Sequence, residues 1–416
     1  MEKQKEQKKD FCAQVTGELM LKEIQKGFNA ENIVLSPLSY TVVLNMTAAE
    51  ATGPTLKQML EYLAVEKIDY LNTKFLDMAA IATTNSDGGP DVCFLSALWV
   101  EQQLRLKKSY QELVKNVYKT RAKSVDFEKK GYHDNIISLP GGILHKNMRR
   151  SNAWAKSATK GLIDQVLKPK HIKEDTKLLL GNALHFKGTW KDNFIERLTQ
   201  NKDFYLLNGD KVSVPFMTGC HNYLYGSFES YQAVKISYEK GKDDKKDFSM
   251  YFFLPNERDG LPSLLKKVNS DSNFFTQDFE LWKETLDAFC IPKFKFSFTT
   301  EEGEKAMQEM GMTLPFEKTC KDLTEVVKNK NVSLYVSMII QKAFVEIDEK
   351  CTEAAVVTFE SEDDLGCCLY QSPPKKFVAD QSFLFMIREE ITRSVLFTGA
   401  VLNPLLNGSD DTTTMA

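Results

Sequence analysis

The chain has 416 residues, of which 42% are hydrophobic and 27% are charged, and its formal net charge is −3. This balance predicts a soluble globular protein, offers no argument for binding nucleic acid or an acidic membrane, and includes no apolar run long enough to span a bilayer. A chain of this length usually forms about two to three domains. No Pro/Gly/Ser-rich linker or internal repeat divides this one, so a single large domain is also compatible with the sequence.

The first ten residues are mostly charged and lack the apolar core of a secretory signal. They predict a cytoplasmic or nuclear protein, or one released by a non-classical route. The eight cysteines are expected to be free thiols there, and none forms a Cys-x-x-Cys pair. Cys220-His221 has no second pair of ligands nearby, so neither a metal site nor another cofactor is expected.

The apolar pattern predicts helices early in the chain and strands later. The expected helices are 13–30, the run that Ser36-Pro37 can cap, 55–60 and 110–118, and the first expected buried strand is 93–100. From Thr176 onward strands dominate, with Pro and Gly between them. This order favours an α+β fold.

The most informative segment lies near the C-terminus. Residues 345–349 alternate apolar and polar side chains, which is the period of a half-buried strand. Small and β-branched residues follow over 352–358, then an acidic stretch to Lys376 and the apolar run 383–387. A strand-competent segment that is held as a loop is a stored conformational change.

This segment resembles the hinge and reactive-centre loop of the serpin family, and its plant members in particular. Six further segments resemble the family in the family order: 32–39, 180–190, 212–217, 248–255, 291–294, and 377–380 through 395–399. One such match would be weak evidence of kinship, whereas seven in order over nearly the whole chain are specific.

The resemblance implies an α+β serpin fold, with a large central β-sheet, two smaller sheets and about nine helices. It implies a single domain over 1–416 with an exposed reactive-centre loop at 351–376. The polar tail 407–416 is expected to be disordered. A monomer is expected, although insertion of a loop into a neighbour's sheet is a hazard of the family.

The resemblance also implies an inhibitor rather than an enzyme. A target serine or cysteine protease attacks the loop and forms an acyl-enzyme; the cleaved loop then enters the main sheet as an extra strand and the tethered protease is distorted. Counted from Glu349, the seventeenth residue is Leu365, so Leu365-Gly366 is the expected scissile bond. A slip of one residue would place Asp364 there instead. Leu suits a chymotrypsin-like or cathepsin-like protease, and Asp an aspartate-specific one.

The expected hinge residues are Glu349, Cys351, Thr352, Glu353, Ala354 and Ala355. Cys351 stands where the family usually has Gly. A residue with a Cβ loses about 1 kcal/mol or more at positive φ, so Cys351 slows insertion if the backbone needs that conformation and is harmless otherwise.

Acidic residues continue the inward face of the loop. Strand alternation places Thr352, Ala354, Val356 and Thr358 on one face, followed by Glu360, Glu362 and Asp364. Burial of an unpaired carboxylate costs a few kcal/mol or more unless it is protonated. Insertion is therefore expected to be slower than for a loop of Ala and Val.

The residues implied in the opening of the main sheet are Ser36, Ser39, Asn182 and Gln341 in the middle, called the shutter, with Trp190 and Lys342 toward the breach beyond it. Gln341 stands where the family usually has His, and Gln381-Ser382 stand where it has His-Pro. Gln donates and accepts hydrogen bonds but lacks the shape of imidazole. The network is therefore either disturbed or quietly preserved.

One connection is longer than the family usually has. Residues 131–142 lie between 125–127, which resembles a strand, and 152–161, which resembles a helix, and they add about a dozen residues that Gly and Pro predict to be a loop. The loop is either a real insertion or a gene-prediction artefact, and it would lie near the front of the main sheet.

Enzyme motifs are absent from the sequence. The five His residues form no His-Glu-x-x-His, and no Gly-x-Ser-x-Gly or P-loop occurs. A basic run around 107–123 is interpreted as a solvated face rather than a polyanion site. Two hypotheses follow: a suicide inhibitor of a serine or cysteine protease, and a non-inhibitory serpin that serves as a protease substrate or an interaction scaffold.

Overall fold

The computed structural model describes residues 10–27, 30–70, 88–127, 149, 152–153, 155–157, 159, 161, 166–173, 175–219, 221–242, 246–271, 273–329, 332–349 and 375–407. Three expected features lie outside this part of the chain: the long connection 131–142, most of the reactive-centre loop 351–376, and all but the first residue of the tail 407–416.

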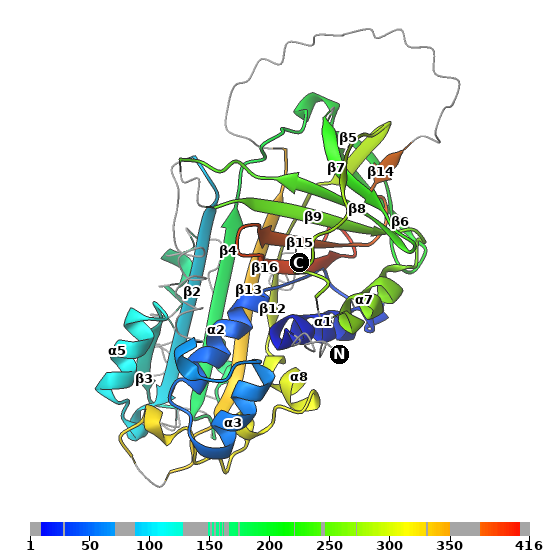
Figure 1. The fold of residues 1–416 in the computed structure, drawn as a ribbon. Helices are drawn as coiled ribbons and strands as arrows, with labels where there is room; N and C mark the ends of the chain where they lie inside the picture. Colours follow the sequence, from blue (N-terminus) through cyan, green and yellow to red (C-terminus); the bar gives the residue numbers. More distant parts are fainter. Residues whose placement is uncertain are drawn as a thin grey trace, which may run out of the picture.

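A five-stranded sheet runs the length of the molecule (Figure 1). Its order is β12 (Phe294–Thr300), β13 (Val336–Ile347), β4 (Leu178–Lys187), β2 (Asp91–Glu101) and β3 (Arg121–Val125). Nine of the ten residues of β4 are buried, which explains why its sequence is a near-continuous apolar run rather than an alternating one.

Two further sheets complete the β structure. The seven-stranded sheet has the order β1 (Ile33–Leu35), β16 (Ser394–Val401), β15 (Phe383–Glu389), β9 (Phe248–Pro255), β8 (Tyr231–Ser237), β7 (Asn222–Ser227) and β10 (Trp282–Thr285). The four-stranded sheet has the order β14 (Lys376–Val378), β11 (Ala288–Pro292), β6 (Lys211–Met217) and β5 (Gln200–Tyr205). The seven-stranded sheet has more strands, but the five-stranded sheet has the longest ones.

Six α-helices have their bounds within the described residues: α1 (Phe11–Ile24), α2 (Pro37–Ala48), α3 (Gly53–Tyr62), α5 (Lys108–Asn116), α7 (Leu261–Ser270) and α8 (Gly303–Glu309). The expected cap of α2 is present, because the Ser36 side chain accepts a hydrogen bond from the Ser39 backbone N–H. The first helix ends at Ile24, earlier than its apolar pattern predicted. No helix of the described residues is both long and apolar enough to cross a membrane.

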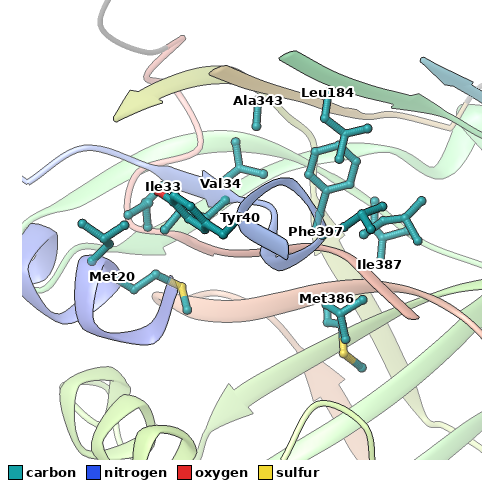
Figure 2. Packing of buried hydrophobic residues seen from close by; sticks show 14 of the residues in the cluster. Met20, Ile33, Val34, Tyr40, Leu184, Ala343, Met386, Ile387 and Phe397 are labelled. Carbon is teal, nitrogen blue, oxygen red and sulfur yellow. The ribbon is translucent and has the colours of Figure 1, made fainter. Parts of the chain in front are cut away.

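The main core lies where α1 and α2 meet the five-stranded and seven-stranded sheets. Figure 2 shows its centre, with side chains from both helices and from strands of both sheets: Met20, Ile33, Val34, Tyr40, Leu184, Ala343, Met386, Ile387 and Phe397. The core therefore joins helices and sheets into one unit, which confirms the expected α+β architecture with three sheets.

Candidate functional site

The centre of the five-stranded sheet is closed. β13 and β4 are parallel neighbours, with register partners from Val336 and Leu178 at one end to Phe344 and His185 at the other (Figure 1). Both strands also pair antiparallel on their outer sides, β13 with β12 and β4 with β2. A further strand could enter here only if the ladder between β13 and β4 separated.

The hinge begins at Glu349, directly after β13. Its carboxylate accepts a hydrogen bond from the Thr199 hydroxyl and pairs with the Lys293 ammonium, with 2.6 Å between Lys293 Nζ and Glu349 Oε2. Burial acts to raise the pKa of Glu349, but the bonds from Lys293 and Thr199 outweigh it and hold that pKa below its usual value. The first residue of the hinge is thus fixed as an anion.

The other predicted loop residues lie outside the described part of the chain. This holds for the hinge residues Cys351, Thr352, Glu353, Ala354 and Ala355, and for Asp364, Leu365 and Gly366 at the expected scissile bond. Their roles remain predictions. What the structure does give is both ends of the segment, Glu349 and Lys375.

The far end of the segment is held by β10, by the turn that follows β10, and by the four-stranded sheet. The Lys375 ammonium pairs with Glu284 at 2.6 Å, and its backbone carbonyl accepts a hydrogen bond from the Asp287 N–H. β14 follows at once and pairs parallel with β11. Residues 350–374 therefore connect two anchored ends.

Trp190 packs at the end of the sheet where β13 leads to the hinge. Its indole N–H donates to the Asp348 carbonyl at 3.0 Å, and its ring stacks on Tyr238 with 4.4 Å between centroids. Gly188 allows this close packing, because a Cβ there would lie 2.5 Å from the Tyr238 ring. Lys342 is buried in β13, level with Ala183 of β4.

The predicted shutter residues lie in one hydrogen-bonded chain in the middle of the sheet. Gln341 accepts from the Ser36 N–H and donates to the Ser36 carbonyl, both at 2.9 Å. The Ser39 hydroxyl donates to the Asn182 amide oxygen at 2.6 Å. The Asn182 amide donates in turn to the Ser96 hydroxyl at 2.8 Å. Gln341 therefore preserves a connection from β13 through α2 to β4 and β2.

Gln381 and Ser382 stand where the family has His-Pro, and only the first of them has its hydrogen bonds satisfied. The buried Gln381 amide donates to the carbonyls of Pro255 and Glu257, at 2.7 and 2.9 Å. Ser382 beside it is fully buried, and its hydroxyl has no hydrogen-bond partner in the described structure. Ser382 thus leaves a polar atom unsatisfied where Pro would leave none.

Several residues of the site were not predicted from the sequence, among them Ser96, Thr199 and Lys293. Lys293 lies within a segment that carried the family resemblance, but nothing in the sequence indicates that it pairs with Glu349. Ser96 and Thr199 carry no distinctive sequence signal, since each acts through a single hydroxyl placed by the fold. Among the described residues, no group of three or more His, Cys, Asp or Glu side chains could hold a metal ion.

Comparison with known families gives a match over nearly the whole chain. The family model described as serpin (serine protease inhibitor) matches residues 6–404. The chain belongs to the serpin family. Its relatives include Serpin-Z2B of Triticum aestivum, which is 37% identical over 382 residues that cover 90% of this chain and 91% of the relative. Serpin-Z10 of Arabidopsis thaliana is 36% identical over 380 residues, covering 90% and 92%.

A solved serpin structure gives the same arrangement. The Arabidopsis serpin AtSerpin1, described in its native stressed conformation, matches with a TM-score of 0.84 and 33% identity, covering 95% of this chain and 98% of its own. Uncleaved ovalbumin matches with a TM-score of 0.78 at 22% identity, which supports the fold alone. The family, the fold and the similarity to plant serpins predicted from the sequence are thus confirmed.

Proposed function

We propose that this serpin is a suicide-substrate inhibitor of serine or cysteine proteases, which acts by cleavage of its reactive-centre loop and insertion of that loop into the five-stranded sheet. The observation that supports this most is the direct parallel pairing of β13 with β4, beside a segment that leaves the end of β13. In the proposed mechanism, the loop would enter between these two strands after they separate.

Strand geometry gives the reason why insertion would release free energy. A strand that folds back from the end of β13 would be antiparallel to both β13 and β4. It would replace one parallel ladder with two antiparallel ladders, and antiparallel pairing is slightly more stable per residue. The loop would also satisfy its own backbone N–H and C=O groups in the sheet.

The chemistry belongs to the protease. Its nucleophile attacks the carbonyl carbon of Leu365, the amine of Gly366 leaves, and an acyl-enzyme remains on the hinge side of the loop. Insertion then competes with hydrolysis of that acyl bond. Leu365 as the acyl residue favours a chymotrypsin-like or cathepsin-like target, whereas Asp364 in its place favours an aspartate-specific protease.

A second function is supported by the composition of the loop. Glu360, Glu362 and Asp364 would share the face that turns inward, and Cys351 replaces the usual hinge Gly. The carboxylates oppose rapid insertion, and Cys351 does so as well if the hinge needs a positive φ at that residue. A slow insertion loses the competition with hydrolysis. The alternative is therefore a non-inhibitory serpin that is a protease substrate or an interaction scaffold.

One experiment separates the two functions. The protein is incubated with a chymotrypsin-like, a papain-like and an aspartate-specific protease, and the products are separated on denaturing gels. A covalent complex larger than the protease is expected for the inhibitor. Cleavage near residue 365 without any complex for all three proteases would support the alternative, and mass spectrometry of the released C-terminal peptide identifies the bond that was cut.

A further inference from the structure

The segment that leads into β4 is bonded to the neighbouring strand at the end of the sheet opposite the hinge. The Lys177 backbone N–H donates to the Ser337 hydroxyl of β13 at 2.9 Å. The Tyr335 hydroxyl, just before β13, donates to the Asp175 carbonyl. These two bonds connect the residues just before β4 with β13 and with Tyr335. For an extra strand to enter, β4 and β13 would have to separate where these bonds lie.

His171 adds a second link from the same segment. Its side chain is fully buried, its Nδ1 accepts from the Lys168 backbone N–H at 3.1 Å, and its Nε2 lies 2.8 Å from Glu301 Oε1. Because Nδ1 is an acceptor, the proton of the neutral ring is on Nε2 and is donated to Glu301. Glu301 directly follows β12, and Lys170 pairs with the same carboxylate at 2.8 Å.

Protonation of His171 would break part of this arrangement. The second proton would occupy Nδ1, so the hydrogen bond from the Lys168 N–H to Nδ1 would be lost. Burial lowers the pKa of His171 below its usual value, and nearby Lys170 and Lys168 act in the same direction, while Glu301 opposes them. A His171 that is released into water regains an ordinary pKa, so a fall in pH favours the released form.

Residues 168–173 and 175–177, with these bonds to β13 and to Glu301, are called the tie. We propose that the tie responds to pH: acidification opens it through His171, and this eases the final entry of an extra strand between β4 and β13. The inference rests on the proposed loop insertion, because only an entering strand has to pass the tie. Such a strand starts at the hinge and reaches the tie last. The tie would therefore control the final part of insertion.

Hydrogen exchange of the intact protein tests the tie without any protease. Backbone protection of peptides that cover 168–177 is measured at about pH 7.5 and about pH 5.5, and each value is corrected for intrinsic exchange. The wild type is expected to lose protection at the lower pH, by at most about tenfold per pH unit for one proton. His171→Asn, which keeps an acceptor for the Lys168 N–H but cannot titrate there, is expected to lose this pH dependence.

Two further variants make the outcome decisive. His221→Asn removes a partly exposed His that contacts the Asn193 carbonyl and none of the residues of the tie named above, and it should behave as the wild type. Tyr335→Phe removes the bond to the Asp175 carbonyl and should lower protection equally at both pH values, which keeps the test available if His171→Asn does not fold. A wild type whose protection is independent of pH, or a His171→Asn protein that retains the dependence, overturns the proposal.

A second measurement links the tie to insertion. After the loop is nicked, the rate at which the protein gains heat resistance is measured at both pH values. The ratio of the rate at about pH 5.5 to the rate at about pH 7.5 is expected to be larger for the wild type than for His171→Asn, in which only the carboxylates of the loop still respond to pH. Equal ratios in the two proteins overturn the role of the tie in insertion. No gain of heat resistance in any protein overturns the proposed function instead, and the exchange data then decide the tie alone.

Discussion

Gln341 stands where the family usually has His, and its hydrogen bonds to Ser36 keep β13 connected to the start of α2. The amide bonds both the N–H and the carbonyl of Ser36, and it is 1% exposed. The sequence alone did not indicate whether the hydrogen-bond network of the shutter is disturbed or preserved. The choice depended on whether the amide reaches the backbone at the start of α2, and it does.

Replacement of Gln341 by Ala is expected to lower the free energy of unfolding by about 2–4 kcal/mol, because it leaves two buried backbone groups of Ser36 without partners. The midpoint of urea unfolding, followed by circular dichroism, measures the change. Gln111→Ala, at an exposed position of α5, is the matched control and should stay within about 0.5 kcal/mol. Equal midpoints for the two variants would contradict the role given to Gln341.

At the scale of elements, α8 is bonded to β13, the second strand of the five-stranded sheet, through Glu304. The Ile339 N–H of β13 donates to the Glu304 carboxylate at 3.1 Å. Burial raises the pKa of Glu304 to about 7. The folded state therefore favours the protonated acid, and the stability that this contributes is present at acid pH and is lost as the pH rises through 7.

Glu304→Gln should remove this loss, since Gln keeps the acceptor for the Ile339 N–H and carries no charge. Relative to the wild type, the variant is expected to gain about 1–3 kcal/mol of stability at about pH 8 and much less at about pH 5. Urea unfolding at the two pH values measures the difference. A gain of the same size at both would show that charge at Glu304 is not its cause.

The reactive-centre loop is the element whose composition most opposes the proposed mechanism. The triple variant Cys351→Gly, Glu360→Ala and Glu362→Ala restores a flexible hinge and removes two carboxylates from the inward face. It is expected to raise the fraction of protease trapped as covalent complex several-fold on denaturing gels. Asp363→Ala, which removes a carboxylate from the outward face, should change this fraction little; an equal rise there would argue against the alternation of faces.

At the scale of the whole molecule, the native fold is proposed to be less stable than the same chain with its loop inserted. Nicking the loop should therefore raise the melting temperature by about 10 °C or more, since each kcal/mol shifts it by a few degrees in a domain of this size. Differential scanning calorimetry of intact and nicked protein gives the two values. Identical transitions would mean that no free energy is stored, and the inhibitor proposal would fail.

The family resemblance predicted the main parts of this molecule because local patterns determine them. The apolar run of β4, the cap at Ser36 and the alternating end of β13 each indicate an element without reference to the rest of the chain. The segments 180–190 and 248–255 carry the family likeness through such runs. The α+β class follows from their order, whereas the three sheets were expected only from the family resemblance.

Tertiary structure decided the contacts that join distant segments. The Lys293–Glu349 pair, the Ser96–Asn182 bond and the His171–Glu301 link each join residues from different parts of the chain. Their side chains are common polar types, and their positions depend on the packing of whole strands to within a hydrogen-bond length. The sequence by itself determined which strands would form; only the folded chain determined that β13 and β4 close on each other, because pairing depends on where the sheets bring the strands and not on the strands' own residues.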